Sequence, residues 1–249
     1  MAYQEFKPSK NLEHIVDSYW FFSSLEPVES EKILPDGCMD IIFNFGALIN
    51  SIATNAVGVS GMMTTFSDKT FDKNTDLFGV RFKPGMLSKL TAFPLFEIKN
   101  KITEASIVIP ELNIETVEQL KELNSIDKKI QLIEREIMYI LYTRVPSNNA
   151  LVFSVIETLD NSPLPISIEN IAKSHCISLR QLERKFKHQV GVTAKEYDRI
   201  ARFTKTKNNI NTQKNKSLLS IALENGYFDH SHLTNEFKRF SGLTPSEFR

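Results

Sequence analysis

The chain has 249 residues, of which 41% are hydrophobic, so it can form one large domain or two ordinary ones with proper cores. Its 30 basic and 30 acidic residues cancel, but they are unevenly placed. From residue 163 onward Lys and Arg outnumber Asp and Glu by 15 to 8, whereas the rest of the chain has 15 basic and 22 acidic residues. This separation excludes a uniformly neutral surface and predicts a polyanionic partner for the C-terminal part.

The number of cysteines and the N-terminal residues indicate in which cellular compartment the protein acts and which metal or disulfide sites it can form. Cys38 and Cys176 are too few for a disulfide framework or a four-cysteine zinc site. The first residues do not resemble a signal peptide, and no run approaches the ~18 apolar residues of a membrane span. We therefore expect a cytoplasmic protein that has no membrane contact, metal site or cofactor.

The first part of the chain, about 100 residues, reads as a small β-rich domain. Residues 11–22 predict a short helical turn that leads into an aromatic strand. In residues 33–46 a Pro-Asp-Gly turn lies between β-forming residues, with Gly37 supplying a positive φ. Residues 57–63 and 77–82 read as further strands. A barrel with some helix is one form that this region can take.

Four polar or aromatic residues of this region are candidates for a ligand pocket: Trp20, Asp36, Asp40 and Arg81. A purely structural interpretation competes with this one. In it, Trp20 belongs to the core, Asp36 to a turn, and Asp40 and Arg81 to an ion pair. The sequence leaves both interpretations open.

Residues 111–144 predict helix with a heptad-like apolar seam. The seam consists of Ile126, Ile130, Ile133, Ile137 and Ile140. Three heptads at most do not establish a coiled coil, so the seam fits either packing against the β-rich domain or a dimer helix between two domains. We expect this helix to relay signals between the domains.

A break at residues 145–149 indicates a linker, and a helix with inward-facing apolar residues follows at 150–159. The prolines within 161–165 end that helix. The predicted division is therefore residues 1–145, a β-rich sensor or dimerisation domain that includes helices 111–144, and residues 149–249, an all-α domain. The fold class is α+β.

One pattern occurs twice in the last 83 residues, at 168–191 and at 218–242. Each copy has a short helix with Ile-Ala, a tight turn, a polar helix start at Ser178 or Asp229, and a second helix that ends at Gly191 or Gly242. A repeat this detailed indicates two copies of one supersecondary unit. Amphipathic hairpins with solvated charged faces are the plainer alternative.

Each copy reads as a helix-turn-helix. The second helix of each copy places a Leu and a Phe four residues apart, which directs one stripe into a core. Ser178 and Asp229 can accept a hydrogen bond from a free backbone N–H, and the two glycines can stop the helices. The opposite face of the first copy is basic, and such a helix fits the major groove of DNA.

Residues 194–210 form a helix between the copies, with Tyr197, Ile200, Phe203 and Ile210 as apolar contacts. At 1.5 Å per residue this rod spans roughly 26 Å. It can hold two recognition helices apart so that each enters the major groove on one face of the duplex, where successive grooves lie ~34 Å apart.

The residues of 178–197 and 221–249, ending in Gly-Leu-Thr-Pro-Ser-Glu-Phe-Arg, resemble the AraC-type bacterial transcription regulators. The resemblance covers about the last 100 residues. Three positions depart from the family pattern: Ala194 stands where Pro is usual, Thr206 where Ala is usual, and Asn235 where a basic residue is common. The N-terminal segment is similar to an uncharacterised domain that precedes such modules, through Leu-Pro-Asp-Gly and Gly-Val-Arg-Phe-x-Pro-Gly.

The resemblance implies a set of base-facing residues on the two recognition helices, since Arg can contact guanine, Glu cytosine and Asn adenine. This set is Arg180, Glu183, Arg184, Ser231, His232 and Asn235. It also implies phosphate contacts, which supply affinity without sequence information. These are Lys185, Lys187, Arg202, Lys238 and Arg239.

The function that the resemblance implies is sequence-specific regulation of transcription. The expected partners are double-stranded DNA, a small-molecule effector in the N-terminal domain, a second copy in a homodimer, and RNA polymerase if the protein activates transcription. No catalytic residues are expected. Two alternatives stay open: an enzyme or repair domain fused to a DNA-binding module, and an interaction module that has lost DNA binding.

Overall fold

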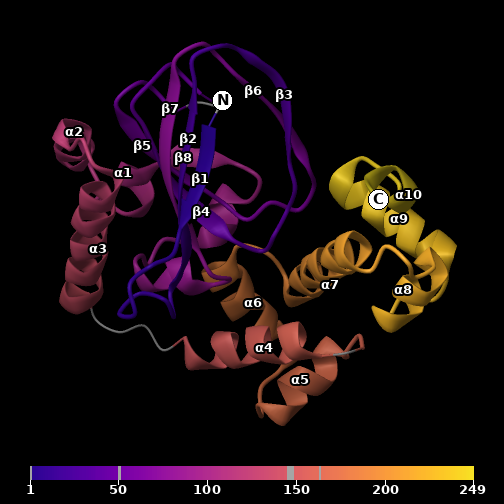
Figure 1. Ribbon diagram of the computed structural model, residues 1–249. Coiled ribbons are helices and arrows are strands. Elements are labelled where there is room, and N and C mark those ends of the chain that lie inside the picture. The colour runs from indigo at the N-terminus through magenta and orange to yellow at the C-terminus, as the bar shows by residue number, and fades with distance from the viewer. Residues whose placement is uncertain (1, 50–51, 145–148, 163) are drawn as a thin grey trace.

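The computed structural model describes residues 2–49, 52–144, 149–162 and 164–249. Strands dominate up to residue 104 and helices dominate after it, which confirms the α+β class (Figure 1). In Figure 1 the strands occupy the upper part of the molecule, and helices α4 to α10 lie below and to the right. Apart from Asn149, the predicted linker at 145–149 lies outside the described residues.

In the described ranges, six antiparallel strands form the main sheet in the order β1-β2-β7-β4-β5-β8, and two more form a ribbon, β3-β6. We call residues 2–104 the β region. Its elements are β1 (Ala2–Phe6), β2 (Val16–Ser24), β3 (Val28–Ile33), β4 (Met39–Asn44), β5 (Ala56–Ser60), β6 (Ser67–Phe71), β7 (Thr75–Phe82), the short 3-10 helices η1 (Met86–Lys89) and η2 (Leu95–Ile98), and β8 (Ile102–Glu104).

The register of the main sheet gives it two different faces, because side chains alternate along each strand. One face carries fully buried residues such as Phe43, Phe78 and Val80, which belong to the main core. On the other face Trp20 pairs with Gly79, and Asp40 pairs with Arg81. A β-carbon at Gly79 would overlap the indole of Trp20, so this position requires glycine.

The predicted Pro-Asp-Gly turn is confirmed. The Cys38 backbone N–H donates to Asp36 Oδ1 at 2.9 Å, and Gly37 has a φ of 85°. This turn joins β3 of the ribbon to β4 of the main sheet, so it connects two layers and does not form a hairpin. The strand predicted at 57–63 ends at Ser60.

The helix predicted at 111–144 is wrong in its continuity. The structure has α1 (Ala105–Val108), α2 (Ile114–Glu122) and α3 (Ile126–Thr143), with a break between α2 and α3. The predicted apolar seam packs within the molecule, because Ile133, Ile137 and Ile140 are buried in the main core. Of the two uses of this seam, the structure therefore supports packing on the β region.

The C-terminal helical region consists of seven helices in the described residues. They are α4 (Ala150–Asn161), α5 (Ile168–Ser174), α6 (Leu179–Val190), α7 (Ala194–Thr212), α8 (Leu218–Glu224), α9 (His230–Ser241) and α10 (Pro245–Phe248). The predicted helix at 150–159 is confirmed, and it packs on α6 and α7 with Val152, Val155 and Ile156 buried.

The β region and the helical region share one continuous hydrophobic core. Helix α6 packs on η1 and η2. Asn149, at the start of α4, is buried and donates to Ser88 Oγ in η1 at 2.9 Å. The two regions therefore meet through packed contacts as well as through the connecting chain.

Candidate nucleic-acid interface and adjoining cavities

The first helix-turn-helix unit is α5 and α6, and local residues define its ends. Ser178 and Gln181 form a reciprocal capping box at the start of α6. Gly191 ends the helix with a φ of 87°. Leu182 and Phe186 are fully buried on one face of the helix, as predicted.

The opposite face of α6 is exposed and basic. Arg180 and Arg184 are exposed there, with Lys185 and Lys187 beside them. Glu183 lies differently: it is half-buried near the start of α7, and burial raises the pKa of its carboxyl against the effect of the Ala194 backbone amide. Its predicted contact with cytosine stays a prediction that requires it to turn outward.

The second unit, α8 and α9, is built in the same way. Asp229 Oδ1 accepts a hydrogen bond from the His232 backbone N–H at 2.7 Å and caps α9. Gly242 ends the helix with a φ of 73°. Leu233 and Phe237 are fully buried. The predicted helix starts and stops are thus confirmed in both units.

The exposed face of α9 is less charged than that of α6. Ser231, His232 and Asn235 are exposed, and Lys238 and Arg239 follow in the last turn. His232 Nδ1 accepts from the Phe228 backbone N–H at 3.2 Å. In the neutral ring the proton then lies on Nε2, which can donate to an acceptor such as guanine O6 or thymine O4.

Arg202 is placed differently from the other phosphate candidates. Its guanidinium donates to Asp198 at 2.6 Å and lies 5.6 Å from the centre of the Tyr227 ring, and its side chain is only 15% exposed. In this arrangement Arg202 is held by α7 and the second unit. Lys185, Lys187, Lys238 and Arg239 are exposed.

Helix α7 joins the units and contains two of the three departures from the family pattern. Ala194 is the first residue of the helix and is fully buried, behind a capping box formed by Thr193 and Glu196. Thr206 is also buried, and its hydroxyl donates to the Arg202 carbonyl oxygen at 2.7 Å. The hydroxyl is therefore satisfied within the helix, which explains why Thr is compatible with this position.

The β region holds a cavity of about 760 Å³ between the main sheet and the β3-β6 ribbon. Its walls are mostly apolar, and include Trp20, Phe22, Ile42, Phe71 and Leu77. Charged side chains also line it, namely Lys69, Arg81, Lys101, Glu31 and Asp40. A concave, largely apolar site with a few polar groups is the usual form of a small-molecule site.

Arg81 connects two acidic residues of this neighbourhood. Its Nε lies 3.3 Å from Asp40 Oδ1 and 3.5 Å from Asp36 Oδ2, and Trp20 Nε1 donates to Asp40 Oδ1 at 3.3 Å. Burial raises the pKa of Asp40 to about 6, and Asp36 adds to the rise while Arg81 opposes it. The structural interpretation of Asp40 and Arg81 as an ion pair is confirmed, yet both also line the cavity with Trp20.

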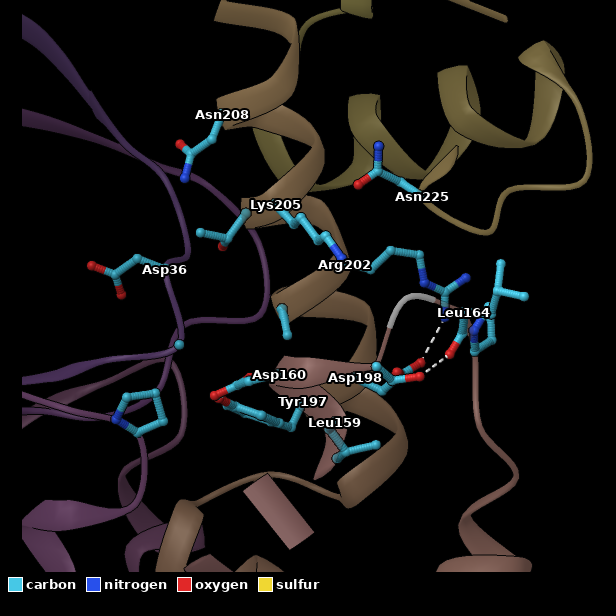
Figure 2. Close-up of a pocket in the computed structure, with 16 residues that line it drawn as sticks. Asp36, Leu159, Asp160, Leu164, Tyr197, Asp198, Arg202, Lys205, Asn208 and Asn225 are labelled. Carbon is cyan, nitrogen blue, oxygen red and sulfur yellow. Dashed lines mark hydrogen bonds and ion pairs between the residues drawn. The ribbon is translucent and has the colours of Figure 1, made fainter. Parts of the chain in front are cut away.

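Asp36, the fourth pocket candidate, lines a second cavity of about 360 Å³ between the regions. Figure 2 shows Asp36 on the β-region side of this cavity, across from Lys205 and Asn208 of α7, with its carboxylate turned away from α7. The Tyr197 hydroxyl donates to Asp160 Oδ1 at 2.8 Å in the same cleft. The four candidates therefore divide between a β-region cavity and an interdomain cleft, with Arg81 and Asp36 in contact.

A loop between β5 and β6 touches both the β-region cavity and the second unit, and sequence reasoning missed it. Thr65 and Phe66 line the cavity. Thr65 Oγ1 donates to the Arg239 carbonyl oxygen at 3.0 Å, and the Phe66 ring lies against Gly242. Lys32 stacks on the Phe66 ring at 3.9 Å. Thr65 and Arg239 are 174 positions apart, so no local pattern could have indicated the contact.

These features define a protein in which a β region with a ligand-sized cavity is packed against two linked helix-turn-helix units. The comparisons with known families agree. Residues 171–249 match a helix-turn-helix domain family, and residues 4–104 match a domain of unknown function, DUF6597. The C-terminal part of this chain is therefore similar to helix-turn-helix domains of the AraC type.

A curated relative supports this assignment. The HTH-type transcriptional regulator ArgR of Pseudomonas aeruginosa is 30% identical over 103 residues, which are 41% of this chain. The match spans 31% of the length of that relative.

Among solved structures, one of ToxT from Vibrio cholerae has a TM-score of 0.50 at 12% identity and covers 92% of this chain and 97% of its own. Another ToxT structure, at 13% identity and a TM-score of 0.48, covers 92% and 96%. The first likeness extends over both regions and concerns the fold. Within the described residues, no helix has the length and apolar character to cross a membrane.

Proposed function

We propose that this chain is a sequence-specific DNA-binding transcription regulator. In the proposal α6 and α9 enter successive major grooves, and the β region modulates them by binding an effector. The observation that carries it is the pair of capped helices, each with a buried Leu-Phe stripe on one side and exposed polar residues on the other. The match of residues 171–249 to a helix-turn-helix family supports it.

The roles of the two helices differ in this proposal. Arg180 and Arg184 are exposed on α6 and suit bidentate contacts to guanine. Asn235 suits adenine, and Ser231 and His232 complete the second reading face. Lys185, Lys187, Lys238 and Arg239 contact phosphates and make binding depend on salt. Both duplex DNA and, in an activator, RNA polymerase are partners under this proposal.

The experiment is selection of binding sites from random duplexes by the full-length chain, followed by a gel shift with the selected duplex. We expect one preferred motif with two parts about one helical turn apart, and affinity that falls steeply with salt. Enrichment of no motif, or equal affinity for scrambled duplexes, would contradict the proposal. Lys73, an exposed lysine between β6 and β7, provides a control substitution, since Lys73→Ala removes the same charge elsewhere.

An effector can change DNA affinity only if it binds the DNA-competent arrangement differently from the other. The β-region cavity has two contacts that suit this linkage. The Thr65–Phe66 loop joins its wall to the end of α9. Arg81 joins it, through Asp36, to the cleft beside α7. Neither route passes through α3, which the sequence predicted to be the relay.

The lining suggests the chemistry of the effector: a mainly apolar molecule with one anionic group. Apolar side chains form most of the wall, and Lys69, Arg81 and Lys101 outnumber Glu31 and Asp40. A volume of about 760 Å³ suits a drug-sized molecule. The Asp40 carboxylate opposes an anion near Arg81, and this opposition weakens as Asp40 takes up a proton around its raised pKa of about 6.

Octanesulfonate is a suitable probe because its charge does not change near neutral pH. We expect calorimetry to show tighter binding at about pH 5 than at about pH 7.5, because a protonated Asp40 leaves Arg81 less neutralised. The Asp40→Asn variant should lose most of this pH dependence. Octanol serves as the uncharged control. If octanol binds as tightly as the sulfonate at both pH values, the proposed anionic effector is wrong.

A homodimer would use a surface other than the predicted isoleucine seam. On the exposed side of α3, Met138, Tyr139 and Tyr142 are 45%, 60% and 90% exposed. They form a second apolar stripe, which we propose as the dimer contact. Sedimentation of Tyr142→Glu should then show a weaker dimer than the wild type. An unchanged distribution of species would remove this stripe from consideration.

A further inference from the structure

The turn between α8 and α9 contains one residue more than the turn between α5 and α6. In the first unit Ile177, whose N–H donates to Ala172, is followed directly by the helix cap Ser178. In the second unit Tyr227 makes the equivalent hydrogen bond to Ala222, but Phe228 intervenes before the cap Asp229. The two units align without gaps on either side, so Phe228 is a single-residue insertion.

Phe228 is held in place although its side chain is in solvent. Its backbone N–H donates to His232 Nδ1 at 3.2 Å. On one side Tyr227 is buried and packs edge-to-face on the His232 ring, with centroids 5.3 Å apart. On the other side Asp229 caps α9. The Phe228 side chain is 85% exposed between these fixed neighbours.

A single exposed aromatic is ordinary on a protein surface, so exposure alone indicates nothing. The position is informative, because the N-terminal residues of a recognition helix are those that reach base edges in the major groove. Phe228 is hydrogen-bonded through its backbone to His232, one of the proposed base-reading residues. Thymine is the only common base with an apolar group in that groove, its 5-methyl.

Resting on the proposed DNA-binding function, we propose that Phe228 reads a thymine through its 5-methyl group at the start of the second half-site. The residue adds an apolar contact to a reading face that is otherwise made of hydroxyl, imidazole and amide groups. The inserted position gives the second unit a contact that the first unit has no residue to make. It also gives α9 specificity without a basic residue at Asn235.

The test uses the full-length chain and its selected duplex, with each thymine of the second half-site replaced in turn by deoxyuridine, which lacks only the methyl group. Burying one methyl is worth ~0.8 kcal/mol, which corresponds to about a fourfold change in Kd. We expect one replacement to weaken wild-type binding by about this factor. Phe228→Ala should bind the two duplexes equally, and Phe228→Leu should keep part of the difference.

Leu223→Ala supplies the matched control, since Leu223 is an exposed apolar residue of α8 outside the reading face. It should leave the thymine-to-deoxyuridine difference unchanged. If Phe228→Ala retains the wild-type difference at every position, or lowers affinity equally for every duplex, the inference is overturned. These results leave the proposed function intact, whereas failure of the wild type to select any duplex would remove that function itself.

Discussion

The two helix-turn-helix units have the same caps and the same buried Leu-Phe stripe, but they are attached to the β region differently. The first unit is packed along α6, on η1 and η2, and Gly191 lies against Met39 and the Leu95 backbone. The second unit meets the β region at the far end of α9, where Thr65 and Phe66 contact Arg239 and Gly242. Residues of both units belong to the continuous core, but the first unit packs on the β region along α6, whereas the second unit contacts it at the end of α9.

This difference in attachment parallels a difference in charge. The exposed side of α6 carries two arginines and two lysines, whereas α9 carries Ser231, His232 and Asn235 at its reading face and two basic residues, Lys238 and Arg239, in its last turn. Contacts to phosphates supply affinity for any duplex, and contacts to base edges supply discrimination. We infer that the first unit provides a fixed, strongly bound support and that the second unit is the one whose position an effector can change.

The largest expected effect is a loss of stability when the core phenylalanine of either unit is truncated. Phe186→Ala and Phe237→Ala should each destabilise their unit by about 3–5 kcal/mol, because both side chains are fully buried. The consequences should differ in extent. Phe186→Ala should speed hydrogen exchange in η1 and η2 as well as in α6, whereas Phe237→Ala should speed it within α8 to α10. Exchange measured by mass spectrometry resolves these segments. Equal acceleration of η1 and η2 in both variants would show that the attachments do not differ.

The next effect concerns DNA affinity. Arg184→Ala should weaken binding to the selected duplex by about 1–3 kcal/mol, because it removes a contact to guanine, and should relax the preference at one position of the first half-site. Asn235→Ala should relax one position of the second half-site instead. Filter binding with single-base variants of the duplex measures both. Lys73→Ala is the control, and a loss there as large as that of Arg184→Ala would mean that net charge alone is responsible.

A smaller loss of stability should follow when the hydrogen bond between the β region and the end of α9 is removed. Thr65→Val removes the hydroxyl that donates to Arg239, at a cost of about 0.5–1.5 kcal/mol. Exchange in the last turn of α9 should become faster while α6 is unchanged, and the response of DNA affinity to a cavity ligand should shrink. Thr75→Val is the matched control, because the Thr75 hydroxyl also donates to a backbone carbonyl oxygen, that of Asp72, within the β region. A response to ligand that survives Thr65→Val would move the coupling to Arg81 and Asp36.

The helix-turn-helix units were predictable because their signals are local. Ser178, Asp229 and the two glycines act on backbone groups within four residues of themselves, so sequence alone places the helix ends. The β region was not predictable to the same depth. Its cavity depends on Trp20 lying opposite Gly79, and the contact with the second unit on Thr65 reaching Arg239. Such pairings are fixed by long-range register, which no local pattern reports.

The same reasoning explains the error in the helix at 111–144. The isoleucine seam is periodic, but Asn124 and Ser125 precede α3 and are residues that commonly start a helix. The prediction of one continuous helix followed the periodicity and overlooked this local start signal. The predicted ion pair of Asp40 and Arg81 is confirmed, and Asp36 also contacts Arg81, whereas a ligand-binding role for these residues stays a prediction. That they line two different cavities follows from the packing of α7, which composition does not encode.

The smallest effect should appear in the salt dependence of DNA binding. Replacing Lys185 and Lys187 by Ala should reduce the slope of log affinity against log salt by about 0.9 for each lost phosphate contact, without changing which duplex is preferred. Replacing Ser231 and Asn235 by Ala should leave the slope unchanged and alter the preference. Lys128→Ala, at an exposed lysine of α3, controls for charge outside the interface. If the neutral substitutions on α9 change the slope as much as the lysine substitutions on α6, then both helices contact the backbone alike, and affinity and discrimination are not divided between the units.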